Sequence, residues 1–523
     1  MRSNPAYVDM LKDPFGSVAT KLGLSDQSTR LLIIALFAIN IFAFFIFIAH
    51  HPLHNHGLRM PWVNPNDQFH HGRWFTPLVF RFAYSADSPV FLPVMSIAVN
   101  IAAALVALRI WRFDLAPGEQ FVVAALITTC PVFLAPFYYT WSTPIMLLGS
   151  AFAVFAVYFG RSLNIQGVAT GAIFVLLAMA TYQPSLSVFA TLAASSLIAH
   201  FLTDKDASWS GHFSRVLSLL ISGLVGGVAY LVSVHVTGAS SHATSTISLS
   251  DLPDRLSKVI DASFLHLTLT QPELLSTVKT VLLVLLVVAL ALAAFRLRTT
   301  LPRMALVLAY ALGLVVATKA MFFVSSDGGF FTYRYNLSMA FMYAFAPAVI
   351  LHLVPRGALR SIVLLLSVCV LIRFTQADLV RQEVLLRGQQ HDLALANRIL
   401  ARMEGLPEVD FSKTYDLVRV GKYSTFRQNL LASRGEKAAT IGDSHMDNGE
   451  ITDRWADEDV MILLGSKIQF RHRQFDAEFL TKVDELKPIL SKRQPWPHAD
   501  SVFVFEDKIV VYMQCGVVHG SGC

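Results

Sequence analysis

The residues best suited to chemistry lie near the N-terminus, in a polar stretch at positions 50–88. Between positions 51 and 75 the one carboxylate is Asp67, which precedes Arg73 by six residues among histidines and aromatic side chains. A positioned carboxylate can act as a general base that takes the proton from an attacking hydroxyl. The alternative is structural, because Asp is also a favoured N-cap and a helix could begin near Phe69.

Six histidines crowd the same stretch and raise the question of a metal site. Their spacings match no recognised zinc pattern, and the stretch contains no cysteine. We therefore predict no metal cofactor, although a divalent ion stays open as an alternative. His70 and His71 follow Asp67 closely enough to bind substrate or to tune its pKa. The six histidines are His50, His51, His54, His56, His70 and His71.

Three cations are candidates for holding a phosphate group as it leaves with developing negative charge. They are Arg73, Arg334 and Lys319. A guanidinium matches phosphate with two parallel hydrogen bonds and neutralises its charge. The alternative for Arg334 and Lys319 is an ordinary cation whose head reaches the membrane interface.

Three uncharged residues are candidate substrate contacts. Trp74 lies in an aromatic setting that suits either a sugar face or the membrane interface. Gln183 follows Tyr182 at the end of an apolar run, where an amide prefers a polar cavity to lipid. We expect Trp74, Tyr182 and Gln183 to contact substrate.

The composition shows which elements must position these residues. Of the 523 residues, 54% are hydrophobic and only 15% are charged, which excludes an ordinary soluble multidomain protein. Residues 1–373 carry 23 Lys/Arg and 14 Asp/Glu, whereas residues 374–523 carry 19 and 22. This division predicts an all-α polytopic membrane domain over 1–373 and a soluble accessory domain over 374–523. The net charge of +6 therefore does not indicate a nucleic-acid partner.

Eleven apolar runs approach the ~20 residues that a bilayer-crossing helix needs. Lys and Arg in the connections place the N-terminus in the cytoplasm, with fourteen on inside segments and six on outside ones. An odd number of spans then puts the C-terminal domain outside, in the periplasm. The long connections, 50–88 and 237–275, both face outward, which predicts a site on that face. The runs are 30–49, 89–110, 120–137, 143–160, 166–182, 185–202, 214–236, 276–295, 302–324, 335–354 and 358–373.

The region after 373 reads as a small α/β domain. Residues 376–404 are expected to form a helix with an apolar face, and the pattern predicts strands at Thr414–Val420 and at Val502–Val511 around a turn at Glu506. Cys515 and Cys523 could pair in an oxidising compartment, or they could be free thiols.

Several short motifs together resemble the serotype-converting type II family of O-antigen glucosyltransferases. The resemblance rests on Asn66-Asp67 before Gly72-Arg73-Trp74, on Tyr182-Gln183, on the Arg334 region, and on Trp496-Pro497 before the strand pair that ends at Val511. It covers nearly the whole chain in layout. Many family members carry two acidic residues well ahead of the Gly-Arg pair, whereas here Asn66-Asp67 precedes Gly72 by only a few positions.

The resemblance implies a GT-C-class glycosyltransferase of the bacterial inner membrane, with Asp67 as catalytic base. Such an enzyme takes a sugar, glucose by family default, from a polyprenyl phosphate on the periplasmic side. It adds the sugar to a lipid-linked or surface polysaccharide such as O-antigen. A donor synthase and a flippase are candidate partners. Our hypothesis is an inverting transfer in which the phosphate leaves against Arg73 and Arg334.

Two other functions stay open at this point. A polysaccharide or lipid-linked sugar transporter would share the many spans, although it would more often show internal repeats or charges in mid-span. An O-antigen polymerase would share the long outer loops, but it would not need a folded C-terminal domain.

Overall fold

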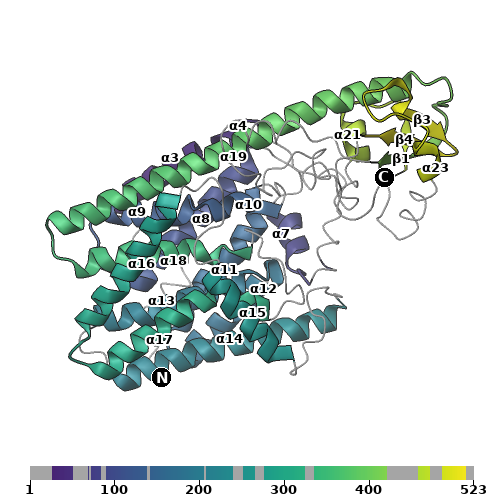
Figure 1. The fold of residues 1–523 in the computed structure, drawn as a ribbon. Coiled ribbons are helices and arrows are strands. Elements are labelled where there is room, and N and C mark those ends of the chain that lie inside the picture. Colours follow the sequence, from purple (N-terminus) through teal and green to yellow (C-terminus); the bar gives the residue numbers. More distant parts are fainter. Residues whose placement is uncertain are drawn as a thin grey trace.

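The structure is a computed structural model, and it describes residues 26–50, 69, 72–83, 90–137, 142–204, 208–238, 251–265, 276–323, 335–420, 457–471 and 486–513. It consists of a helical bundle, one very long helix and a small sheet (Figure 1). Several residues named from the sequence lie outside the described ranges, among them Asp67, His70, His71, Arg334, Cys515 and Cys523.

Apolar helices fill the bundle. Within the described residues, seven helical stretches are long and apolar enough to cross a membrane: Phe91–Trp111 (α8), Pro117–Phe137 (α9, η2 and α10), Thr143–Gly160 (α11), Ser185–Thr203 (α13), Trp209–Thr237 (α14), Thr277–Arg296 (in α16) and Ala358–Glu383 (in α19). Four shorter apolar helices are Gln27–Ala43 (α3), Ile165–Thr181 (α12), Leu301–Ala317 (α17) and Ser338–Leu353 (α18). Each predicted run therefore coincides with a helix, and the helical membrane domain is confirmed. Eleven crossings stay a prediction.

Helices at the centre and at the rim of the bundle differ in how much of their surface is exposed. Every residue of α18 from Ser338 to Leu351 is buried, as expected for a helix that is apolar on all sides. On the rim, α14 exposes large aliphatic side chains such as Leu224, at 69%, and Val228, at 51%. Such side chains suit a helix that faces lipid on one side, because the membrane interior is itself apolar.

Glycines allow α11, α12 and α14 to pack closely. A Cβ on Gly226 of α14 would lie 2.6 Å from the carbonyl oxygen of Ala172 and 2.6 Å from the Cβ of Val175, both in α12. A Cβ on Gly171 would lie 2.8 Å from the Cα of Gly160 in α11. Small residues at helix interfaces let backbones approach closely in membrane proteins. The position of α14 therefore depends on these contacts.

The last membrane helix continues without a break into the C-terminal domain. Helix α19 (Ala358–Glu404) has 47 residues and is roughly 70 Å long. Its first half packs into the bundle core through residues such as Phe374, and its second half packs into the C-terminal core through Ile399 and Met403. The helix predicted at 376–404 is confirmed, and it extends the last span (Figure 1).

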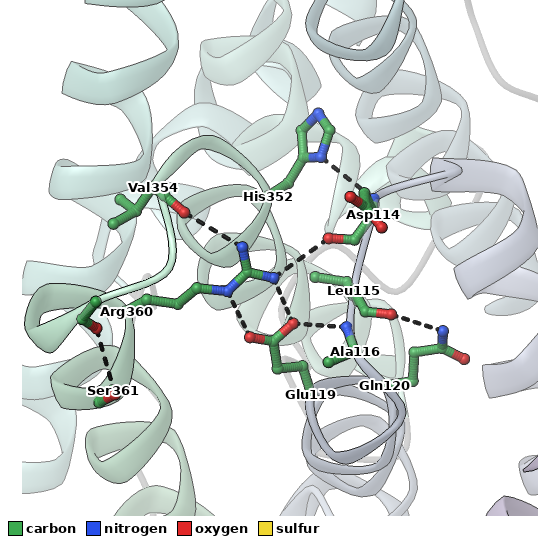
Figure 2. A network of polar contacts seen from close by, with 10 residues as sticks. Asp114, Leu115, Ala116, Glu119, Gln120, His352, Val354, Arg360 and Ser361 are labelled. Atoms are coloured by element: carbon green, nitrogen blue, oxygen red, sulfur yellow. Dashed lines mark hydrogen bonds and ion pairs between the residues drawn. The ribbon is translucent and has the colours of Figure 1, made fainter.

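The beginning of α19 is held by an ion pair with α9 (Figure 2). Arg360 donates from Nε to Oε1 of Glu119 at 2.5 Å and from Nη2 to Oε2 at 2.6 Å. Its Nη1 also donates to the carbonyl oxygen of Val354 at 3.3 Å. Glu119 in turn accepts from the backbone N–H of Ala116 at 2.7 Å, which satisfies a donor at the start of α9. The pair thus joins α9 to the turn between α18 and α19.

The C-terminal sheet has strand order β2-β1-β4-β3. The strands are β1 (Thr414–Val420), β2 (Gln469–Phe470), β3 (Val502–Phe505) and β4 (Lys508–Tyr512), and the short helices are α21 (Asp457–Leu463) and α23 (Lys487–Leu490). β1 runs parallel to β2 and β4, while β3 and β4 form an antiparallel hairpin. Both predicted strand regions and the turn at Glu506 are confirmed.

Helix α19 is docked to this sheet through Arg402. The guanidinium carbon lies 4.4 Å from the centroid of the Trp496 ring, and Nη1 donates to the carbonyl oxygen of His498 at 2.7 Å. Together with the shared apolar core, these contacts attach the sheet to the end of the helix.

Candidate functional site

A break between two membrane helices organises the candidate site. α12 ends at Thr181 and α13 begins at Ser185. Pro184 lacks an N–H and disfavours a helical conformation in the residue before it, so the chain turns here. Tyr182 is extended, with φ −157° and ψ 102°, and both Tyr182 and Gln183 are buried. The pair that the sequence marked therefore lies inside the protein, at one end of the bundle.

The Gly-Arg-Trp segment docks onto this break. The backbone N–H of Phe75 donates to the carbonyl oxygen of Ala180 at 3.2 Å, and Oγ1 of Thr76 donates to that of Thr181 at 3.3 Å. Carbonyls in the last turn of a helix lack partners within the helix, and here the segment supplies donors to two of them. Gly72 turns the chain with φ 74°, a left-handed conformation that glycine adopts readily. The segment then enters α7 (Thr76–Ala83).

Arg73 contacts both residues of the break. Its Nε donates to Oε1 of Gln183 at 3.1 Å, and its guanidinium carbon lies 5.3 Å from the centroid of the Tyr182 ring. Nε2 of Gln183 donates to the hydroxyl of Tyr230 in α14 at 3.1 Å. Arg73 is thus oriented by side chains from the break and, through Gln183, by α14. Three of the residues predicted to bind donor or substrate are brought together.

Trp74 is also held by α14, through a residue one turn after Tyr230. Its Nε1 donates to Oγ of Ser233 at 2.8 Å, and that Oγ donates to the carbonyl oxygen of Tyr230 at 2.6 Å. The indole ring also meets Phe75 edge to face, with centroids 5.9 Å apart. Helix α14 therefore holds Trp74 directly and Arg73 through Gln183.

Lys319 reaches the same region from another part of the chain. It lies between α17 and η6 (Ala320–Phe323), is 1% exposed, and donates to Oδ1 of Asn336. The backbone N–H of Met321 donates to Oγ of Ser187 at 2.9 Å, which ties this turn to the start of α13. Arg73 and Lys319 thus belong to two segments that are both attached to residues 180–187.

An amphipathic helix covers the turn that holds Lys319. Helix α15 (Leu252–Leu265) comes from the second long connection, and Val259 packs against Met321 and Phe322 of η6. Its opposite side carries charges, among them an exposed ion pair of 2.7 Å between Asp254 and Lys258. Both long connections therefore contribute a short helix at this end of the bundle.

Sequence reasoning missed the positioning residues on α14. Tyr230 and Ser233 lie in a long apolar run, and single polar residues in such a run were the one signal available. Asn336, the partner of Lys319, was missed for the same reason. The contacts on α14 join distant parts of the chain, since Trp74 and Ser233 are 159 residues apart and Gln183 and Tyr230 are 47 apart.

A second group of polar residues lies just after position 373, in the region that the sequence assigns to the C-terminal domain. Asp378 and Arg381 lie on α19 and are 0% and 2% exposed. Gln382 beside them donates to the carbonyl oxygen of Ala43 at 2.6 Å and accepts from the backbone N–H of Phe47 at 3.1 Å. Phe47 belongs to α4 (Phe45–His50), which leads into the first long connection. Charged residues of α19 are thus buried at the base of that connection.

In the part of the chain that the structure describes, no group of three or more His, Cys, Asp or Glu residues could hold a metal ion. Five of the six histidines in the first connection lie outside that part. The expectation that no metal is used therefore stays a prediction.

The bundle and the site together define a membrane protein with a set of hydrogen-bonded polar side chains at one end. Residues 44–351 match the family described as glucosyl transferase GtrII. The match covers more than half of the chain, so the protein belongs to this family and is a membrane glycosyltransferase. No curated protein and no solved structure matches the chain.

The range of the match separates two parts of the molecule. It contains every candidate site residue, including Arg73, Gln183 and Lys319, whereas α19 and the C-terminal sheet lie beyond it. The resemblance seen in the sequence motifs is confirmed for the membrane part.

Proposed function

We propose that this protein transfers glucose from a polyprenyl-phosphate donor to a lipid-linked or surface polysaccharide such as O-antigen. The reaction takes place at the periplasmic face of the bacterial inner membrane, with the N-terminus in the cytoplasm. The observation that carries the proposal is the hydrogen bond of 3.1 Å that orients Arg73 on Gln183, inside the range that matches the family. An oriented guanidinium beside aromatic residues suits the binding of a sugar phosphate.

The proposed chemistry is a single inverting displacement. Asp67 takes the proton of an acceptor hydroxyl while that oxygen bonds to the anomeric carbon of the sugar. The bond from this carbon to the donor phosphate oxygen breaks, and the polyprenyl phosphate leaves with the electron pair. Arg73 and Arg334 neutralise the phosphate, since oriented cations at a developing charge stabilise the transition state.

The described residues support the separate roles to different extents. Arg73 is half-buried and presents a planar group of five N–H donors, one of which is oriented by Gln183. Lys319 is buried next to η6, at the same end of the bundle as Arg73. Trp74 is half-buried and supplies an aromatic face for the sugar, whereas Tyr182 is buried and its ring lies against the guanidinium of Arg73. His70 and His71, four and three residues ahead of Trp74, are proposed to contact the substrate.

The test uses membranes that contain the full-length protein, labelled polyprenyl-phosphate glucose and a polysaccharide acceptor. We expect Asp67→Asn to lower transfer by about 10²- to 10⁴-fold, because it removes the base and keeps the side-chain shape. Asp254→Asn is the matched control, since this carboxylate forms only an exposed ion pair with Lys258. Full transfer by Asp67→Asn would show that Asp67 is not the catalytic base. Failure of the wild type with every lipid-phosphate sugar would exclude this donor class.

A further inference from the structure

A cavity of about 250 Å³ lies between α3, α8, α9 and α11. Its lining includes Phe37, Ala102 and Phe155 along most of its length, and Thr29, Arg109 and Gln120 near the helix ends. Arg161, after the end of α11, donates to the carbonyl oxygen of Arg109 at 3.5 Å. This end is therefore the one from which α12 begins. The cavity mouth is separated from the break at Tyr182 by the length of α12, 17 residues or roughly 25 Å.

The polarity of the cavity changes along the helix direction. On α8 the lining runs from Ala98 to Arg109, about 16 Å along the axis, and on α3 it runs from Thr29 to Phe37. The polar members lie together at one end and the remaining wall is apolar. Apolar cavities hold water poorly, and they take apolar groups instead. The shape and polarity fit one hydrocarbon chain that lies parallel to the helices below a polar head.

The charges at the polar end select the head group. Arg112 follows Arg109 by three residues, Arg161 donates to the carbonyl oxygen of Arg109, and Arg30 follows Thr29 of the lining. Together with Arg109 they make four arginines, against three nearby carboxylates. Of those carboxylates, Asp26 at the start of α3 accepts a hydrogen bond from Ser28. Glu119 forms an ion pair with Arg360. Asp114 lies five residues after Arg109 and is not part of the cavity lining. The mouth is therefore positive and suits a phosphate, which a guanidinium binds with two hydrogen bonds.

We propose that this cavity binds one acyl chain of an acidic glycerophospholipid from the bilayer, with the lipid phosphate held by Arg109. The bound lipid would fill the space between α3 and α8 and fix the first helix against the bundle. This site lies at the opposite end from the candidate transferase site and does not depend on the reaction proposed there.

Native mass spectrometry of the full-length protein in detergent tests the proposal, with phosphatidylglycerol and phosphatidylcholine as probes. We expect one phosphatidylglycerol to bind in preference to phosphatidylcholine. Arg109→Ala should weaken that binding by about tenfold, as expected for the loss of hydrogen bonds to a charged group. Arg298→Ala removes an exposed arginine near the end of α16, away from the cavity, and should bind as the wild type does. Equal binding of both lipids, or unchanged binding by Arg109→Ala, would overturn the proposal.

A second measurement identifies the occupant directly. Phosphatidylglycerol with a photoactivatable acyl chain should label the peptides that contain Phe37 or Ala102, and Ala102→Trp should abolish this labelling by filling the cavity. Labelling that spares both peptides excludes a lipid chain from the cavity. A cross-link from a photoreactive residue at position 102 to residues 1–25 of the same chain would show that the N-terminal segment occupies it instead.

Discussion

Arg73 and Gln183 are joined by a hydrogen bond of 3.1 Å between Nε and Oε1, although 110 residues separate them in the chain. The bond exists because α12 ends one residue before Tyr182, and because the Gly-Arg-Trp segment pairs with the last carbonyls of that helix. Gln183 is itself held by Tyr230 on α14. The orientation of one cation thus depends on three separate segments.

Replacing Gln183 by Leu should lower the rate of sugar transfer by roughly 10- to 100-fold. The change keeps the side-chain volume but removes the acceptor for Arg73, and hydrogen bonds to charged groups are worth roughly 1.5–3 kcal/mol. Tyr230→Phe removes only the partner of the amide, and we expect a smaller loss of roughly 2- to 10-fold. Transfer kinetics at varied donor concentration would measure both, and a positioning role predicts a change in donor KM or kcat without loss of folded protein.

Tyr310→Phe is the matched control for Tyr230→Phe. Its hydroxyl lies 2.9 Å from Nε2 of His212, at the end of α14 farther from the site. If Gln183→Leu transfers sugar at the wild-type rate, the contact with Arg73 is structural only.

Gly226→Ala should destabilise the protein and also slow transfer. The new Cβ would lie 2.6 Å from the carbonyl oxygen of Ala172, so α14 has to move, at a cost of ~1–3 kcal/mol for overpacking. Tyr230 lies one turn further along α14 and would move with it. Thermal unfolding in detergent and a transfer assay would show both effects.

The neighbouring glycine supplies the control for this substitution. A Cβ on Gly227 meets no atom within 4 Å, so Gly227→Ala should leave the unfolding midpoint and the transfer rate close to the wild-type values. Equal losses in the two variants would show that the close contact of Gly226 with α12 is not their cause, because Ala favours a helix more than Gly does.

Arg360→Ala should lower stability much more than Arg387→Ala, although both remove an arginine from α19. The side chains of Arg360 and Glu119 are 13% and 8% exposed, whereas those of Arg387 and Glu383 are 52% and 35% exposed. Leaving a largely buried carboxylate without its partner costs several kcal/mol, and the partial exposure reduces this to about 2–3. An exposed i,i+4 pair is worth ~0.5 kcal/mol or less. Unfolding midpoints that fall equally would contradict this ranking.

The C-terminal sheet should lose stability at strongly alkaline pH. Burial by itself lowers the pKa of Lys508, but hydrogen bonds from its ammonium to Glu506 and Asp507 outweigh burial and raise that pKa. A raised folded-state pKa means that the contribution is complete below the ordinary value of 10.5 and is lost as the pH rises through the folded value. Hydrogen exchange of the β4 amides, followed upward from pH 10.5, should show this loss.

Lys508→Met should reduce the alkaline dependence, because the side chain no longer titrates. Lys413→Met is the control, since Lys413 forms only an exposed contact of 3.7 Å with Asp410. A wild-type pH profile in the Lys508→Met protein would exclude this lysine as its source.

The helical class and the positions of most elements followed from local patterns. Apolar runs of near-membrane length marked α8 and α11, and a short run rich in strand-forming residues marked β1 at Thr414–Val420, because burial of these elements is written in their own composition. The sequence did not show clearly where the membrane part ends. The reason is that one helix, α19, packs first against the bundle and then against the C-terminal sheet. Asp378, which is buried, lies within the charged region after position 373 that the sequence assigns to the C-terminal domain.

By itself, the sequence determined that this is a membrane protein with a folded C-terminal domain, and its short motifs placed it in a glucosyltransferase family. Hydropathy and motif spacing are local properties, so they can be read from the chain. Only the tertiary structure decided that Arg73 meets Gln183, that Tyr230 and Ser233 support the site, and that α19 links both domains. These relationships arise where helices distant in sequence pack together, and no local pattern records them.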